Sequence, residues 1–181
     1  MKTLIARLAP TLDLGDNSID NGRLLAAISI VESNGGRNRQ PNFEPAFYVG
    51  GRYWNAHLAE LVNQWEQASD VKMRPWCGRA VACSWSPWQI LYITAEELGF
   101  NGAPWELSHP ATGLHYAIRL INKRIVPRLV HGDTMDTLAQ IAGRYNAGSN
   151  WRMAKRYIAK VTAHYTSDDS PLNRLIELGD I

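Results

Sequence analysis

Apolar side chains recur three or four positions apart along most of the chain, whereas the strict alternation typical of strands is scarce. The first such stripe follows the capping pair Asp20-Asn21 and ends at Gly35-Gly36. A later one begins at Ser86-Pro87, a cap residue followed by a proline at the first helical position. The pattern predicts helices over residues 24–31, 58–65, 86–99, 118–125, 138–145 and 154–165, and a short last one from Ser170-Pro171.

The stretch from Arg37 to Ser84 is less regular and is rich in Gly, Pro, Asn and aromatic residues. Outside its one apolar stripe, it is predicted to hold long loops or a small β-hairpin. The chain has 181 residues and contains no internal repeat, low-complexity tract or linker. We therefore expect an all-α, α-rich single domain over residues 1–181, with an irregular region or small β-hairpin within about 37–84.

Composition narrows the class of protein. The chain is 45% hydrophobic and 20% charged, with a net charge of +2. This is too little and too scattered a charge for a nucleic-acid binder. No run reaches the roughly 18 apolar residues of a membrane span. The apolar start is broken at Arg7 and no cleavage site follows, so we expect it to belong to the fold rather than to a signal peptide.

The two cysteines, Cys77 and Cys83, are six positions apart and lack the spacing of a zinc site. A disulfide remains open, although two buried free thiols are favoured. The aromatic content is less ordinary, with seven Trp and seven Tyr against three Phe. Trp and Tyr combine a flat apolar face with a polar group. Their excess suits a ligand groove, and a Trp-rich core is the alternative.

Glu32 is the strongest candidate for chemistry. It follows Leu25 and Ile28 at helical spacing, so its carboxyl group continues the apolar stripe into the last turn. Partial desolvation and the negative end of the helix dipole both raise a carboxyl pKa. A carboxylic acid that is protonated near neutral pH is what a glycosidase uses to protonate a leaving oxygen. The alternative is a side chain that turns into solvent.

Two further segments hold candidate polar groups. In one, Ser86 and Gln89 fit a capping box; alternatively, Gln89 points its amide into a groove where Trp88 offers a sugar a flat face. In the other, Tyr145 lies on an apolar stripe and its hydroxyl needs a partner, while Asn146 precedes the helix stop. The alternative for Tyr145 is a core residue bonded to backbone.

Together the three segments resemble the lytic transglycosylase and goose-type lysozyme superfamily, which cleaves peptidoglycan glycan strands. The resemblance covers about residues 22–165, and Ser86 stands where the family has Gly. A Phe-Glu-Pro-x-Phe-Tyr segment, residues 43–48, is similar to one in phage-encoded members. The segments that carry the resemblance are Ile30-Val31-Glu32-Ser33, Ser86-Pro87-Trp88-Gln89-Ile90, Pro110-x-x-Gly113, Ile141-Ala142-Gly143-Arg144-Tyr145-Asn146-Ala147-Gly148 and Tyr157-Ile158-Ala159-Lys160-Val161.

The resemblance implies a lysozyme-like fold and a peptidoglycan-degrading enzyme without metal or cofactor. Glu32 would act as general acid and base on the β-1,4 bond between N-acetylmuramic acid and N-acetylglucosamine, giving a 1,6-anhydro product. A hydrolytic muramidase and a non-catalytic virion or wall-binding protein are the alternatives. Supporting or substrate-binding roles fall to Ser33, Glu44, Tyr48, Trp88, Gln89, Tyr145 and Asn146.

Within this set, Ser33 and Tyr145 would position Glu32, while Gln89 and Asn146 would hold the substrate. Glu44 would support catalysis or form an ion pair with an arginine. The expected partners are glycan strands and, as a further option, other virion proteins, but neither nucleic acid nor a membrane. We expect a phage endolysin or virion component, made in the cytoplasm and acting on the cell wall. The aromatic residues expected to border the glycan are Tyr48, Tyr53, Trp54, Trp76, Trp85, Trp88 and Tyr145; Trp65, Trp105 and Trp151 are expected in the core.

Overall fold

The computed structural model describes residues 1–15, 18–38, 40–130 and 132–176. This part of the chain forms eight α-helices and one three-stranded antiparallel sheet, which confirms the predicted α-rich fold with a little β-structure. The helices are α1 (Lys2–Leu8), α2 (Asn21–Ser33), α3 (Ala56–Gln67), α4 (Arg74–Ala80), α5 (Tyr92–Glu97), α6 (Pro110–Leu120), α7 (Thr134–Ala147) and α8 (Lys155–Thr166). The strands are β1 (Asn42–Phe43), β2 (Cys83–Trp85) and β3 (Ile90–Leu91).

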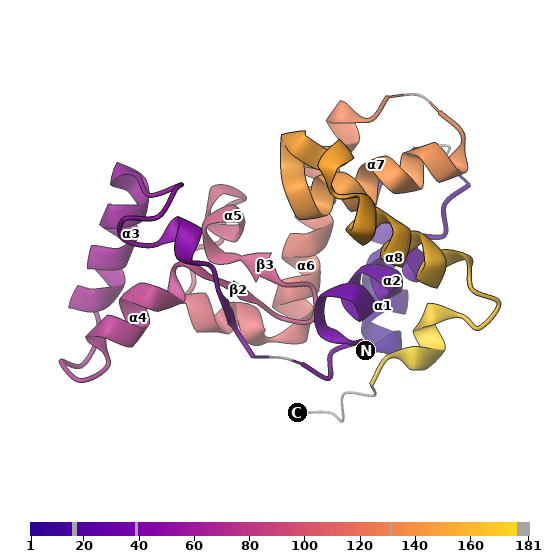
Figure 1. Ribbon diagram of the computed structural model, residues 1–181. Coiled ribbons are helices and arrows are strands. Elements are labelled where there is room, and N and C mark those ends of the chain that lie inside the picture. Colours follow the sequence, from indigo (N-terminus) through magenta and orange to yellow (C-terminus); the bar gives the residue numbers. More distant parts are fainter. Residues whose placement is uncertain (16–17, 39, 131, 177–181) are drawn as a thin grey trace.

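The elements form two groups that are joined by the sheet and two helices. In Figure 1, α3 and α4 stand at one end of the molecule and α1, α2, α7 and α8 at the other, with the strands, α5 and α6 between them. All residues of α2 from Leu24 to Ile30 are buried, and α8 packs along it. As predicted, Asp20 caps its start by accepting a hydrogen bond from the Arg23 amide. The helix ends at Asn34, whose left-handed backbone redirects the chain just before the two glycines.

The predicted helix start at Ser86-Pro87 is wrong. Residues 86–89 form a tight turn that joins β2 to β3, and α5 begins only at Tyr92. Ser86 and Gln89 have φ values of +70° and +47°, which the N-cap and the first turn of a helix do not adopt. The capping-box interpretation of these two residues is therefore also wrong. The family's glycine at this position is consistent with the left-handed backbone that Ser86 has here.

Helix α4 lies inside the stretch that was expected to be irregular. It is short, and Pro75 in its first turn is compatible with a helix because that position has no intrahelical N–H bond. Gly78 allows it to approach α3, since a Cβ atom at this position would lie 2.3 Å from Glu66 Oε1. The sequence pattern missed this helix because its stability comes from packing on α3 rather than from a long apolar stripe.

Four of the tryptophans join α3 and α4 to the body of the molecule. The rings of Trp65 and Trp105 are 5.4 Å apart, those of Trp105 and Trp76 5.9 Å, and those of Trp76 and Trp85 6.4 Å. Edge-to-face and tilted contacts at such distances stabilise aromatic clusters. Much of the aromatic excess is thus explained by packing, and Trp76 and Trp85 belong to this cluster rather than to a groove.

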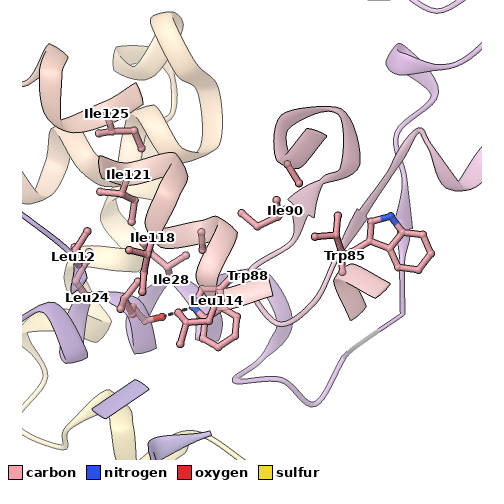
Figure 2. Packing of buried hydrophobic residues seen from close by; sticks show 14 of the residues in the cluster. Leu12, Leu24, Ile28, Trp85, Trp88, Ile90, Leu114, Ile118, Ile121 and Ile125 are labelled. Carbon is pink, nitrogen blue, oxygen red and sulfur yellow. Dashed lines mark hydrogen bonds between the residues drawn. The ribbon is translucent and has the colours of Figure 1, made fainter. Parts of the chain in front are cut away.

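Trp88 is a core residue. Its side chain is 0% exposed, and its Nε1 donates a hydrogen bond to the Leu25 carbonyl at 3.0 Å (Figure 2). The expectation that its ring offers a face to a sugar is therefore wrong. Burying a side chain as large as Trp88 is favourable because it removes a large apolar area from water.

Tyr48 and Trp54 also pack against each other, with their ring centroids 6.2 Å apart.

Cys77 and Cys83 are both buried free thiols. Burial raises the pKa of Cys83 to about 11, which keeps it as a thiol.

Over the described ranges, none of the helices has the length and apolar character needed to cross a membrane.

The turn at 86–89 and helix α6 fit together through one small residue, which gives a first prediction. A Cβ atom at Gly113 would lie 2.3 Å from Ser86 Cβ. We expect Gly113→Ala to lower the free energy of unfolding by about 2 kcal/mol, since overpacking a tight contact is costly. Adding Ser86→Gly should restore most of this loss, because it removes the clashing atoms and suits the positive φ. Chemical denaturation of both variants tests this; equal stability of the single and double variants would contradict it.

Candidate active site

Glu32 lies in the last turn of α2 with its carboxyl group partly buried. Its Oε1 accepts a hydrogen bond from the Tyr157 hydroxyl of α8 at 2.6 Å. Burial raises the pKa of Glu32 to about 7, the Tyr157 hydrogen bond opposes this rise, and the negative charge of Glu44 adds to it. The predicted direction is confirmed. At neutral pH the carboxyl group is therefore present in both protonated and ionised forms.

The neighbouring turn, residues 86–89, is held in place by bonds from two helices and by one bond within the turn. Ser33 Oγ donates to the Pro87 carbonyl at 2.8 Å, and the Tyr145 hydroxyl of α7 donates to the Trp88 carbonyl at 2.8 Å. Gln89 Nε2 closes the turn on the Ser86 carbonyl at 3.0 Å. Segments 30–33, 86–90 and 141–148 of the resemblance thus come together at one turn, where hydrogen bonds to its carbonyl groups connect them.

These bonds change the roles expected of Ser33 and Tyr145. Neither hydroxyl has a hydrogen bond to Glu32 among the described residues. They act on Glu32 indirectly, because they fix the end of α2 and the end of α7 against the same turn. The alternative for Tyr145, a phenol bonded to backbone, is the one observed. Burial and the nearby Glu32 charge raise the pKa of Tyr145 well above its ordinary value, so it remains a donor.

A first cleft of about 700 Å³ opens in front of Glu32. Its walls come from α2, the sheet, the end of α6 with the π-helical turn Ile121–Ile125, and the end of α7. Side-chain amides are frequent in this lining, and amides suit the hydroxyl and N-acetyl groups of a sugar because they both donate and accept. The amide-bearing residues are Asn38, Gln40, Asn42, Gln89 and Asn146, and the other polar or aromatic ones include Glu44, Phe47, Tyr53, Arg128, Arg144 and Tyr145.

A second cleft of about 610 Å³ adjoins the first. Glu32 and Asn146 line both, so the carboxyl group sits where the two clefts meet. The remaining wall of the second cleft belongs to Val31 and to residues at the start of α8 and just before it: Met153, Ala154, Lys155, Arg156, Tyr157 and Lys160. An elongated ligand could therefore extend to either side of Glu32.

The other predicted site residues are divided between cleft and packing. Gln89 lines the first cleft, although its amide is already bonded to Ser86 and its Oε1 accepts from Ser84 Oγ at 2.8 Å. Asn146 is exposed at the junction. Glu44 lines the first cleft and accepts a hydrogen bond from Asn42 Nδ2 at 2.6 Å, and among the described residues it has no ion pair with an arginine. Tyr48 lies outside the lining of both clefts, which corrects the expectation of a binding role.

Tyr157 is the site residue that sequence reasoning missed. It lies in the segment Tyr157-Ile158-Ala159-Lys160-Val161, which contributed to the resemblance but was assigned no role. It also occupies a position on an apolar stripe, where a tyrosine is ordinarily interpreted as a core residue.

Of the aromatic residues expected to border a glycan, Tyr53 and Tyr145 do line the first cleft, and Phe47 lines it as well. Within the residues described, no group of three or more His, Cys, Asp or Glu side chains is placed to hold a metal ion.

Compared with protein-family models, curated proteins and solved structures, the chain has no match. Its function is therefore inferred from the geometry of the site and from the motif resemblance.

Replacing Tyr157 tests its contact with Glu32. The hydroxyl bond favours the ionised carboxylate, so we expect Tyr157→Phe to raise the pKa of Glu32 above about 7. Carboxyl NMR titration with selectively labelled glutamate measures it. Tyr145→Phe is the matched control, since its hydroxyl donates to a backbone carbonyl instead. A larger rise in the control than in Tyr157→Phe would contradict the assignment.

Burial of Glu32 also predicts a pH-dependent stability. The folded pKa of about 7 lies above the ordinary value of 4.5, so the folded state holds the proton more tightly than the unfolded chain does. Wild-type stability should therefore fall as pH rises from about 4.5 to about 7. Glu32→Gln keeps an acceptor for Tyr157 and serves as the reference. Relative to it, the free energy of unfolding of wild type should have fallen by about 3 kcal/mol once the pH is above this range.

Thermal melts of both proteins at pH 4, 6 and 8 measure this difference. Glu60→Gln, which removes an exposed carboxylate on α3, is the control for the change in net charge. A difference between wild type and Glu32→Gln that stays constant with pH would show that the carboxyl group is not desolvated.

Proposed function

We propose that this protein cleaves the β-1,4 bond between N-acetylmuramic acid and N-acetylglucosamine in peptidoglycan, with Glu32 as general acid and base. One observation carries the proposal. A carboxyl group with a pKa raised to about 7 lies where two clefts meet, within an α-rich fold, on the residue that the resemblance assigns to catalysis. Its environment supplies the protonated form that a glycosidic oxygen requires.

In the first step, protonated Glu32 donates its proton to the leaving glycosidic oxygen while the C1–O bond breaks through an oxocarbenium-like transition state. Glu32 is then ionised, and Tyr157 stabilises that form by its hydrogen bond. In the second step the carboxylate takes the proton of the muramic acid 6-hydroxyl, whose oxygen bonds to C1. The product is a 1,6-anhydro sugar, and Glu32 is protonated again.

The second step needs no other carboxylate because the nucleophile belongs to the same sugar. A hydroxyl held within one molecule has a high effective concentration. Hydrolysis is the second candidate, and Glu44 favours it. Its carboxylate lines the same cleft and raises the pKa of Glu32 through its charge. A carboxylate facing the general acid across the substrate is what an inverting glycosidase uses to activate water.

For the biological setting, we propose a bacteriophage product that acts on the cell wall, either as an endolysin or as a virion component. The similarity of residues 43–48 to a segment of phage-encoded members supports this setting. In the virion case, other virion proteins would be partners as well as the glycan strands.

Digestion of purified peptidoglycan tests the activity. We expect wild type to release soluble muropeptides and Glu32→Gln to release at least about a thousandfold less, since a general acid and base contributes at both steps. Glu60→Gln should match wild type, as its side chain lies outside the lining of both clefts. Full activity of Glu32→Gln would refute the proposal, and an inactive wild type that still binds the wall would support a non-catalytic protein.

The mass of the products separates the two candidate reactions. A muramic acid end lighter by one water than the hydrolysed form indicates the 1,6-anhydro product of a transglycosylase. A reducing muramic acid end indicates a lysozyme. In the second case Glu44→Gln should also lose activity, whereas an intramolecular second step leaves less for Glu44 to do.

A further inference from the structure

The two clefts that meet at Glu32 differ in their free charges. Three cationic side chains line the second cleft, from Lys155, Arg156 and Lys160 of α8. All three are exposed, and within the part of the chain that the structure describes none of them makes an ion pair or a side-chain hydrogen bond. The only carboxyl group in this lining is Glu32 itself.

The first cleft also contains arginines, but together with a second carboxyl group. Arg124 pairs with Glu97 at 2.7 Å, the guanidinium of Arg144 lies 5.6 Å from the centre of the Trp151 ring, and Arg128 has no ion pair among the described residues. The described lining of the first cleft thus mixes these cations with Glu44 and five amides, whereas that of the second combines three cations with one amide, Asn146.

The spacing on α8 makes the cations part of one surface. Arg156 and Lys160 are four residues apart and so lie on the same side of the helix, and Tyr157, which reaches Glu32, lies between them in sequence. Met153 in the lining of this cleft is 83% exposed, so its side chain is accessible to a ligand. The second cleft therefore combines positive charge with an apolar contact, beside the reacting group.

We infer that the second cleft binds the stem peptide of peptidoglycan by its carboxylates. This inference rests on the proposed function. The stem peptide is attached to muramic acid through its lactyl group, next to the bond that is cleaved, and carries free carboxylates and methyl side chains. Lys155, Arg156 and Lys160 match the carboxylates, and Met153 matches the methyl groups. In peptide-bearing strands the lactyl group is amidated and the glycan backbone is neutral; it runs through the amide-rich first cleft, while the second cleft binds the carboxylates of the peptide.

The experiment measures binding without turnover. In the Glu32→Gln background, the dissociation constant is determined for short glycan fragments that carry stem peptides and for the same fragments with the peptide carboxylates converted to carboxamides. We expect about tenfold tighter binding of the form with free carboxylates at low salt, since three exposed ion pairs each contribute modestly. This preference should shrink at high salt.

Two triple variants locate the effect. Lys155→Gln, Arg156→Gln and Lys160→Gln together should reduce the preference to about one, while binding of the amidated fragment persists. Arg7→Gln, Lys72→Gln and Lys123→Gln remove the same charge from exposed positions outside both clefts and should leave the preference intact. Thermal melts establish that both variants are folded.

Each remaining outcome is decisive. An equal affinity of the parent protein for the two fragments overturns the inference and leaves the proposed function standing. A failure to bind either fragment overturns both. A glycerol phosphate polymer competes as a probe for phosphate chemistry: if it displaces the fragments while an excess of free stem peptide does not, the cations serve phosphate groups and the inference is wrong.

Discussion

The main physical constraint on this structure is that the Glu32 carboxyl group lies partly buried at the end of helix α2. Moving Glu32 away from water raises its pKa to about 7, so its ionised form is less favourable than that of an exposed carboxyl group. Among the described residues no cation pairs with it, and its side chain has a hydrogen bond with the Tyr157 hydroxyl. The surrounding core has to offset this cost, and it can because α2 is buried along Leu24–Ile30 and packs against α8. Function and stability thus make opposing demands on one residue.

The turn at 86–89 shows how the rest of the site is fixed. Its carbonyl groups accept hydrogen bonds from Ser33, Tyr145 and Gln89, and its Trp88 ring extends into the core, where Nε1 reaches Leu25. Residues that the resemblance connects with the active site therefore serve the structure as well. They set the relative positions of α2 and α7, so Glu32 and Asn146 face the same space.

The sequence allowed α2 and the direction of the Glu32 pKa shift to be predicted, because both follow from local spacing and from a cap at Asp20. The prediction at Ser86 was wrong, because the pattern Ser-Pro-x-Gln fits a helix start as well as it fits the turn that is observed. There, bonds from residues 33 and 145 hold the alternative turn, and nothing near Ser86 in the sequence reveals them. Tyr157 was missed for the same reason, since its partner Glu32 is 125 residues away. Long-range contacts override local propensity at these points.

A pKa near neutrality suits a group that must give and then take a proton. If the pKa of Glu32 stayed at its ordinary value, the protonated form would be rare at neutral pH, and if it were far higher, the carboxylate would be too costly to form. Burial moves the value upward and the Tyr157 hydrogen bond limits the rise. The same balance serves attack by an internal hydroxyl or by water, so the acid itself does not determine the product. In the proposed reaction, that choice would lie in which oxygen the first cleft holds beside C1, and Glu44 is the second carboxyl group in the described lining of that cleft.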